Sequence, residues 1–159
     1  MSDDEFPDGR LPVDPDIDAR PPHLAMALVI FVGGCVGGLS RYEIGRRWPS
    51  TSGSFPWDTF FVNLSGAFAL AVVVTFVTVS ARPRWFVRPL LGTGFIGSYT
   101  TFSALVTSTD LLAAHGHLAV AVAYSIGSIF LGSASVLLGF LLARWIAARW
   151  WPGYARSIR

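Results

Sequence analysis

Lysine is absent from this sequence: all twelve basic residues among its 159 are arginine. Acidic residues are scarce outside the first 18 positions, which hold seven of the ten, leaving Glu43, Asp58 and Asp110 for the rest of the chain. The formal net charge of +2 is therefore unevenly distributed and does not indicate nucleic-acid binding. Nothing in the sequence indicates an enzyme.

Cysteine is almost absent as well. The single Cys35 lies in an apolar run, which excludes an internal disulfide and a cysteine-based metal cluster. With 52% hydrophobic residues and a mean hydropathy of +0.52, the chain is too apolar for an ordinary soluble domain and too short for two membrane domains. We expect one membrane domain in residues 23–146, followed by a short basic tail in residues 147–159.

Residues 1–22 have a different composition from the rest of the chain. They are rich in acidic residues and proline and poor in large hydrophobic residues, so they cannot form a packed core. The sequence predicts a disordered acidic tail here. A signal peptide would need a basic start directly before an apolar stretch, so cleavage is not expected.

Four apolar segments approach or exceed the roughly 20 residues that a helix needs to cross a bilayer core of about 30 Å. They comprise residues 24–45, 58–79, 88–112 and 117–143. Short connections containing proline and glycine require neighbouring helices to pack antiparallel. The predicted fold class is an all-α integral membrane protein with four transmembrane helices.

Arginine is distributed unequally between the two sides that four spans would create. An even number of spans places both termini and the second loop on one side. That side includes Arg20, Arg82, Arg84, Arg88, Arg144, Arg149, Arg156 and Arg159, whereas the other holds Arg41, Arg46 and Arg47. The positive-inside rule predicts a multi-pass protein of the plasma membrane with cytoplasmic termini.

The first span contains glycines at the spacing that allows another helix backbone to approach closely, namely Gly33, Gly34, Gly37 and Gly38. Arg41 follows one turn later. A guanidinium near a span end either extends to the headgroups or has a structural or ion-attracting role. Both interpretations are open from the residues alone.

Polar residues in the second and fourth spans fall on single helical faces. Thr59, Asn63 and Gly66 share one face, and Asn63 is costly in hydrocarbon unless it is hydrogen-bonded. Asn63 is either an interhelical clasp, worth about 1 kcal/mol, or a donor to an anion. Tyr124 and Ser128 share a face at i and i+4, where they either bond their own helix or provide successive donors for a passing ion.

The third span carries small and hydroxyl residues at its centre: Gly92, Gly94, Gly97, Ser98, Thr100, Thr101 and Ser103. Glycine weakens a helix, and clustered Ser and Thr compete for backbone hydrogen bonds. One interpretation is a helix broken at its centre, with carbonyls that protein or an ion must satisfy. The other is a kinked but continuous helix packed through its small residues.

Four motifs in register resemble those of the CrcB/Fluc family of fluoride channels, over nearly all of residues 25–144. The first three have the patterns GGxxGxxxRY, TxxVNxxGxF and GxxGxxTTFS. They are formed by Gly33, Gly34, Gly37, Arg41 and Tyr42, by Thr59, Val62, Asn63, Gly66 and Phe68, and by Gly94, Gly97, Thr100, Thr101, Phe102 and Ser103. The fourth matches Tyr124, Ser128, Gly132 and Gly139.

The resemblance implies an antiparallel, dual-topology-type dimer with two narrow pathways for passive fluoride export. It implies a structural sodium ion at the dimer interface, held by the backbone carbonyls of Gly97 and Thr100. The implied pathway residues are Asn63, Phe102, Thr59, Thr101, Ser103, Tyr124 and Ser128. Arg41, Gly33, Gly34, Gly37 and Gly66 take structural or ion-attracting roles.

Three positions depart from the family pattern. The family has a second phenylalanine where this chain has Leu105, an acid where it has Ser108, and commonly a threonine where it has Ala104. With the one-sided arginine distribution, this motivates a heterodimer with an inverted paralogous subunit as an alternative to a homodimer. Further alternatives are a non-conducting partner subunit and a small four-helix drug exporter. The exporter would need a carboxylate within a span, whereas Glu43 and Asp110 lie near span ends.

Overall fold

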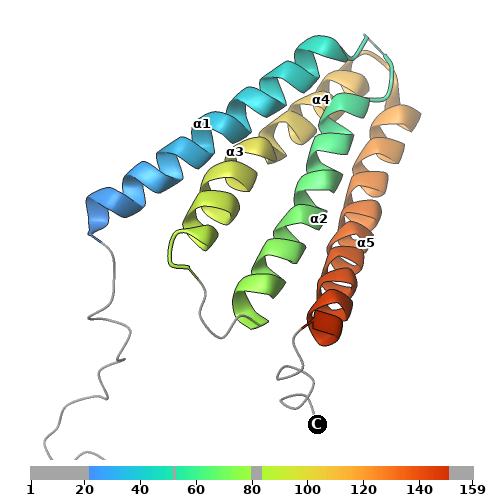
Figure 1. Cartoon of the computed structure of the whole chain (residues 1–159). Helices are drawn as coiled ribbons and strands as arrows, with labels where there is room; N and C mark the ends of the chain where they lie inside the picture. Colours follow the sequence, from blue (N-terminus) through green and yellow to red (C-terminus); the bar gives the residue numbers. More distant parts are fainter. Residues whose placement is uncertain (1–21, 52, 80–83, 151–159) are drawn as a thin grey trace, which may run out of the picture.

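The computed structural model describes residues 22–51, 53–79 and 84–150, and every regular element in these ranges is helical. The elements are α1 (His23–Arg47), α2 (Trp57–Val79), η1 (Arg88–Ile96), α3 (Gly97–Tyr99), α4 (Phe102–Ala114) and α5 (Leu118–Trp150). The chain reverses direction from α1 to α2, from α2 to η1 and from α4 to α5 (Figure 1). The expectation of an all-helical fold is confirmed, whereas residues 1–21 and 151–159 of the predicted tails lie outside the described part.

Among the described residues, three helices are long and apolar enough to cross a membrane: α1, α2 and residues 118–149 of α5. Their most apolar windows have mean hydropathies of 1.9, 2.2 and 2.1. Residues 88–112, expected to form the remaining span, are divided among η1, α3 and α4. The helix α5 continues to Trp150, beyond the end predicted at residue 143 and into the predicted tail.

The helices form two closely packed pairs, α1 with η1 and α2 with α5 (Figure 1). η1 is a π-helix, in which the Gly97 amide reaches back five residues to the Gly92 carbonyl. A nine-residue π-helix is long for a form that usually occupies a single turn and is frequent at functional sites. The segment from η1 to α4 lies between α1 and the α2–α5 pair.

Glycine determines how closely α1 approaches η1. A Cβ added at Gly33 would collide with the Leu90 carbonyl oxygen, and one at Gly37 would collide with the Phe95 carbonyl oxygen. Gly94 meets α1 from the opposite side, against the Ile30 carbonyl. The close approach expected from the small-residue spacing of the first span is therefore present.

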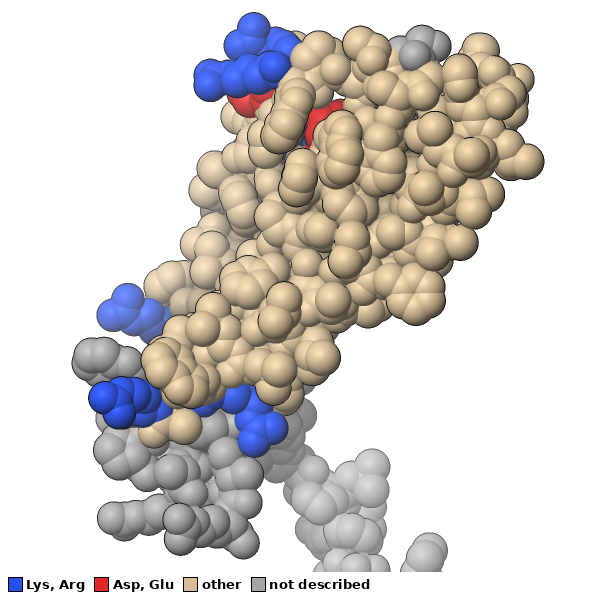
Figure 2. Space-filling view, turned by 90° about the vertical axis from the view of Figure 1, so that its right-hand side faces the viewer, with Lys and Arg blue, Asp and Glu red and all other residues tan. Residues whose placement is uncertain are grey.

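The surface separates charge from apolar area. Arginine side chains gather at both ends of the molecule and acidic side chains at one of them, and the long surface between the ends shows no charged side chain on the face in Figure 2. Large apolar side chains are exposed along this surface, including Phe31 at 67% and Phe130 at 71%. An exposed apolar area of this extent indicates contact with lipid or with another protein.

We predict that Gly37→Ala destabilises the fold, because the new methyl group would meet backbone atoms, which cannot move aside as a flexible side chain can. Overpacking of this kind costs about 1–3 kcal/mol. The measurement is the midpoint of thermal unfolding in detergent. Gly38→Ala is the matched control, because a Cβ at Gly38 has no atom within 4 Å. Equal midpoints for the two variants would contradict the close packing of α1 on η1.

Candidate functional site

Two residues with extended backbone separate α3 from α4. Thr100 has φ −79° and ψ 155°, and Thr101 has φ −150° and ψ 116°, so neither continues the helix. The Thr101 side chain then begins α4, because its Oγ1 accepts a hydrogen bond of 3.2 Å from the Ala104 amide. Threonine at this position is a favourable N-cap.

The Asn63 carboxamide on α2 satisfies the backbone between α3 and α4. Its Nδ2 donates to the Thr101 carbonyl oxygen at 3.0 Å, and its Oδ1 accepts from the Thr101 amide at 2.8 Å. The structure therefore places Asn63 in the clasp arrangement. A carboxamide has two N–H donors, and this pairing uses one of them.

Two backbone carbonyls next to the clasp lose the donors that a continuous helix would supply. In a regular helix each carbonyl accepts from the amide four residues later. The Thr101 amide, four residues after Gly97, donates instead to Asn63. The Ala104 amide, four residues after Thr100, donates instead to the Thr101 hydroxyl. The oxygens of Gly97 and Thr100 are thereby open to another ligand.

Two buried hydroxyl groups on α5 have no hydrogen-bond partner in the part of the chain that the structure describes: Tyr124 Oη and Ser128 Oγ. Tyr124 is completely buried. Ser125, beside it in sequence, differs because its Oγ donates to the Ala121 carbonyl at 2.9 Å and lies 3.1 Å from Thr109 Oγ1. Since buried polar groups are nearly always paired, the two unpaired hydroxyls require an explanation.

A cavity of about 540 Å³ lies beside the clasp, between α2, the start of α4 and α5. It brings together six of the predicted site residues: Asn63, Gly66, Thr100, Thr101, Phe102 and Ser128. Gly66 is necessary for this geometry, because a Cβ there would collide with the Thr100 side chain. The Phe102 ring is 78% exposed and therefore does not belong to the apolar core of this subunit.

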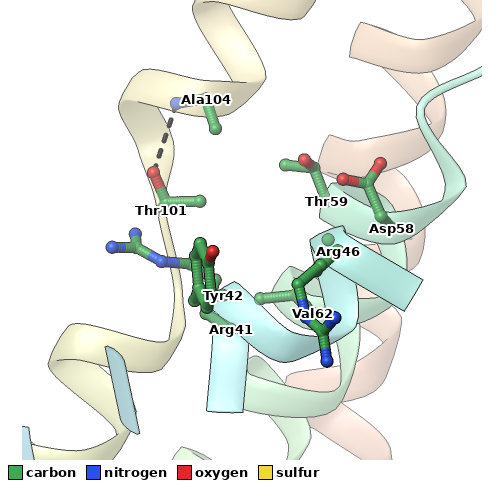
Figure 3. Close-up of a pocket in the computed structure, with 9 residues that line it drawn as sticks. Arg41, Tyr42, Arg46, Asp58, Thr59, Val62, Thr101 and Ala104 are labelled. Atoms are coloured by element: carbon green, nitrogen blue, oxygen red, sulfur yellow. Dashed lines mark hydrogen bonds between the residues drawn. The ribbon is translucent and has the colours of Figure 1, made fainter. Parts of the chain in front are cut away.

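A second cavity, of about 400 Å³, lies toward the C-terminal end of α1. Figure 3 shows Asp58 and Thr59 on one side of it and Thr101 and Ala104 on the other, with Arg41 at the α1 side. Thr101 lines both cavities, so they meet at the helix interruption. Thr59 was expected to share a helical face with Asn63. In the structure Thr59 lines this second cavity, whereas Asn63 lines the cavity beside the clasp.

Arginines at this end differ in pairing. Arg46 and Arg47 bind the Glu43 carboxylate at 2.9 and 3.3 Å, whereas Arg41 has no ion pair with any residue that the structure describes. Arg41 thus has no direct ion-pair partner among the described residues, although the Asp58 carboxylate lines the same cavity. This position is compatible with the ion-attracting role considered from the sequence.

Some predicted residues lie outside the two cavities. Ser103 is exposed and lies 3.2 Å from Thr101 Oγ1, but it is part of neither lining. Gly33, Gly34 and Gly37 face η1 and α3 instead. Asp58 lines the second cavity, but the sequence did not predict this role. The only sequence feature that indicated it was the position of a carboxylate near the start of a span.

The helices and the unpaired polar groups among them define a small all-helical membrane protein. Residues 28–140 match the model of the CrcB-like (camphor resistance) proteins, so the chain belongs to the CrcB family. A relative from Streptomyces avermitilis named "Fluoride-specific ion channel FluC 3" is 44% identical over 120 residues, which cover 76% of this chain and 59% of the relative. "Fluoride-specific ion channel FluC 2" from Nocardia farcinica is 39% identical, over 80% of this chain and 92% of the relative.

We predict that Asn63→Ala lowers the stability of the protein, because it leaves the amide and the carbonyl of Thr101 without partners. Each buried group left unpaired costs about 1–3 kcal/mol. Thermal unfolding in detergent, together with hydrogen exchange at the Thr101 amide, measures the effect. The matched control is Thr78→Val on the same helix, because Thr78 Oγ1 bonds only to carbonyls of its own helix, at Val74 and Thr75. Undiminished protection of the Thr101 amide in Asn63→Ala would refute the clasp.

Proposed function

We propose that this chain is a subunit of a fluoride-selective channel that exports cytoplasmic fluoride passively and so lowers fluoride toxicity. The proposal is carried by one observation: a member of the CrcB family, with relatives named fluoride-specific ion channels, has two buried hydroxyls without a partner among the described residues. One of them, Ser128, lines the cavity beside Asn63, whereas Tyr124 lines neither cavity. An ion channel is not an enzyme, and the proposal needs no catalytic residue.

Fluoride is small and strongly hydrated, so a pathway must replace its water with closely placed donors. The hydroxyls of Tyr124 and Ser128 and the second N–H of Asn63 are suitable donors. The exposed ring of Phe102 can add the positive edge of its quadrupole. Each anion that leaves a cell with a negative interior gains about 2.3 kcal/mol per 100 mV, so no energy source is needed.

The two cavities support a continuous route. The guanidinium of Arg41, which has no ion pair among the described residues, would attract anions to one mouth. From there the ion would pass Thr59 and Thr101 into the cavity lined by Asn63, Phe102 and Ser128. Thr101, common to both cavities, would be the narrow point of this route, with Ser103 beside it.

The carbonyls of Gly97 and Thr100 fit a structural sodium ion. Na⁺ is a hard cation that prefers oxygen ligands, and both carbonyls have lost their helical donors. Two carbonyls are too few for a complete site, so a second subunit would supply the other half. The ion would hold two subunits together at their helix interruptions and would not be transported.

An antiparallel dimer accounts for the exposed apolar features. The cavity beside the clasp opens at the exposed Phe102, and a second subunit would enclose it. Leu105, in place of the expected aromatic ring, lines the same cavity. This departure leaves two arrangements: a homodimer, or a heterodimer with an inverted paralogous subunit in which this chain is the half-active or non-conducting partner.

We predict that the purified chain releases fluoride from liposomes when it is reconstituted with sodium, while chloride is retained. An electrode selective for fluoride measures the release. Selective efflux by the chain alone supports the homodimer, and efflux that begins only after a paralogous subunit is added supports the heterodimer. No fluoride efflux with or without that subunit would refute the channel.

The same liposomes test the sodium ion. Replacing Na⁺ with N-methylglucamine on both sides is expected to reduce efflux and to shift the protein toward monomers in size-exclusion chromatography. Unchanged efflux together with unchanged assembly would contradict the sodium proposal but not the proposal that the protein is a channel.

We predict that Ser128→Ala reduces fluoride current, because it removes an unpaired donor from the route. A net hydrogen bond is worth about 1 kcal/mol, which corresponds to roughly fivefold in rate. Ser133→Ala on the same helix is the matched control, because Ser133 Oγ already donates to the Ile129 carbonyl at 2.8 Å. Currents in planar bilayers compare the variants. Equal currents in both would remove Ser128 from the pathway.

A further inference from the structure

The connection between α1 and α2 is tied to the opposite side of the bundle end. Its turn is closed by the Ser54 amide, which donates to the Thr51 carbonyl at 3.1 Å, and by a contact of 2.9 Å between the two side-chain hydroxyls. Gly53 has φ +79°, and a Cβ there would collide with the imidazole of His117 at the start of α5. The turn therefore lies directly against the connection between α4 and α5.

The residue that follows this turn, Phe55, packs into an aromatic cluster inside the bundle end. Its ring centroid lies 5.2 Å from that of Tyr124 with an interplanar angle of 86°, an edge-to-face contact. It lies 5.1 Å from Phe60 at 78° and 4.4 Å from Trp57. Phe60 is in turn 6.5 Å from Tyr124. A loop side chain thus contacts a fully buried residue of α5.

Tyr124 depends on these rings for its position. Its hydroxyl makes no hydrogen bond of normal geometry with the described residues, although the Thr59 side chain on α2 is close enough to interact with it, so the aromatic rings supply the contacts of defined geometry. Edge-to-face pairs have a preferred geometry and contribute beyond their buried area. Phe55 and Phe60 therefore orient the ring, and of the two only Phe55 comes from outside the helices.

We propose that Phe55 is a positioning residue: the α1–α2 connection holds the Tyr124 ring so that its unpaired hydroxyl is directed as a donor to the ion. This inference rests on the proposed function for its consequence in conduction. Phe55 itself does not contact the ion and acts only through Tyr124. The connection on the surface thereby influences a donor in the interior.

A double-mutant cycle tests this coupling. Phe55→Leu keeps an apolar side chain but removes the ring edge, and we expect fluoride current in planar bilayers to fall roughly two- to tenfold. Tyr124→Phe removes the hydroxyl and lowers the current as well. In the double variant Phe55→Leu should add nothing to the effect of Tyr124→Phe, because the group through which it acts is gone. Phe55→Tyr, which keeps the ring, should retain the wild-type current.

Phe61→Leu is the matched control within the same cluster. The Phe61 ring stacks on Trp48 at 5.7 Å and on Trp57 at 5.6 Å and meets the Phe60 ring edge-on at 5.8 Å. Among the described residues, the rings in contact with Tyr124 are those of Phe55 and Phe60, so Phe61 reaches Tyr124 only through Phe60. The current of Phe61→Leu should equal that of the wild type. The proposal would be overturned if the current of the double variant fell by the product of the two single-variant reductions, or if the current of Phe55→Leu were unchanged.

A readout independent of conduction separates this proposal from the proposed function. Fluorine NMR of protein labelled with 3-fluorotyrosine, with the Tyr124 signal assigned by Tyr124→Phe, should show one conformer in the wild type and in Phe61→Leu but several in Phe55→Leu. If Phe55→Leu does not fold, Phe55→Met replaces it in both experiments. A wild-type chain without fluoride current refutes the channel, whereas an unaltered Tyr124 signal in the folded Phe55 variant refutes the positioning role.

Discussion

A backbone interrupted among helices that cross a bilayer must find its hydrogen bonds inside the protein, because lipid supplies none. Here the Asn63 carboxamide meets both the amide and the carbonyl of Thr101, at 2.8 and 3.0 Å. Without it, two polar groups between α3 and α4 would be unsatisfied, and a continuous helix would be favoured. The clasp therefore determines whether the extended residues Thr100 and Thr101 can exist at this position.

The remaining features of the site follow from that interruption. Extended backbone turns Phe102 outward and places Thr101 where it lines both cavities. Redirected amides leave the carbonyls of Gly97 and Thr100 available. Close approach of α1 to η1 through Gly33 and Gly37 positions the first part of the third segment. One side chain on α2 thus links the packing of the bundle to the groups proposed to bind ions.

The helices were predictable because membrane insertion demands long apolar runs, which composition reveals directly. The same holds for Gly33 and Gly37, where spacing alone implies close packing. The hydrogen-bond partner of Asn63 could not be predicted from the sequence. The cost of Asn63 in hydrocarbon was evident, but the clasp and the anion donor were both compatible with it, and its partner lies 38 positions away in the chain.

Phe55 was not singled out at all, because a loop phenylalanine beside proline has no periodic pattern to mark it. Its role arises from contacts among the α1–α2 connection, α2 and α5 that depend on the complete fold. In the sequence, Gly53 indicates only a short connection, whereas in the structure its close approach to His117 fixes where that connection lies. Long-range aromatic contacts of this kind carry no local sequence signature.

The hydroxyl groups on α5 divide into those that have a hydrogen-bond partner and those that have none among the described residues. Ser125 and Ser133 donate to carbonyls of their own helix, which is the low-cost arrangement for a hydroxyl in a membrane. Ser128 has the same chemistry and the same kind of helix around it, yet its hydroxyl is buried and unpaired, as is that of Tyr124. Since leaving a buried donor unpaired costs free energy, any water, partner subunit or bound ion that supplied an acceptor would stabilise this arrangement. Under the proposed function, fluoride in the cavity that Ser128 lines would be such an acceptor, and a larger anion would fit there less closely.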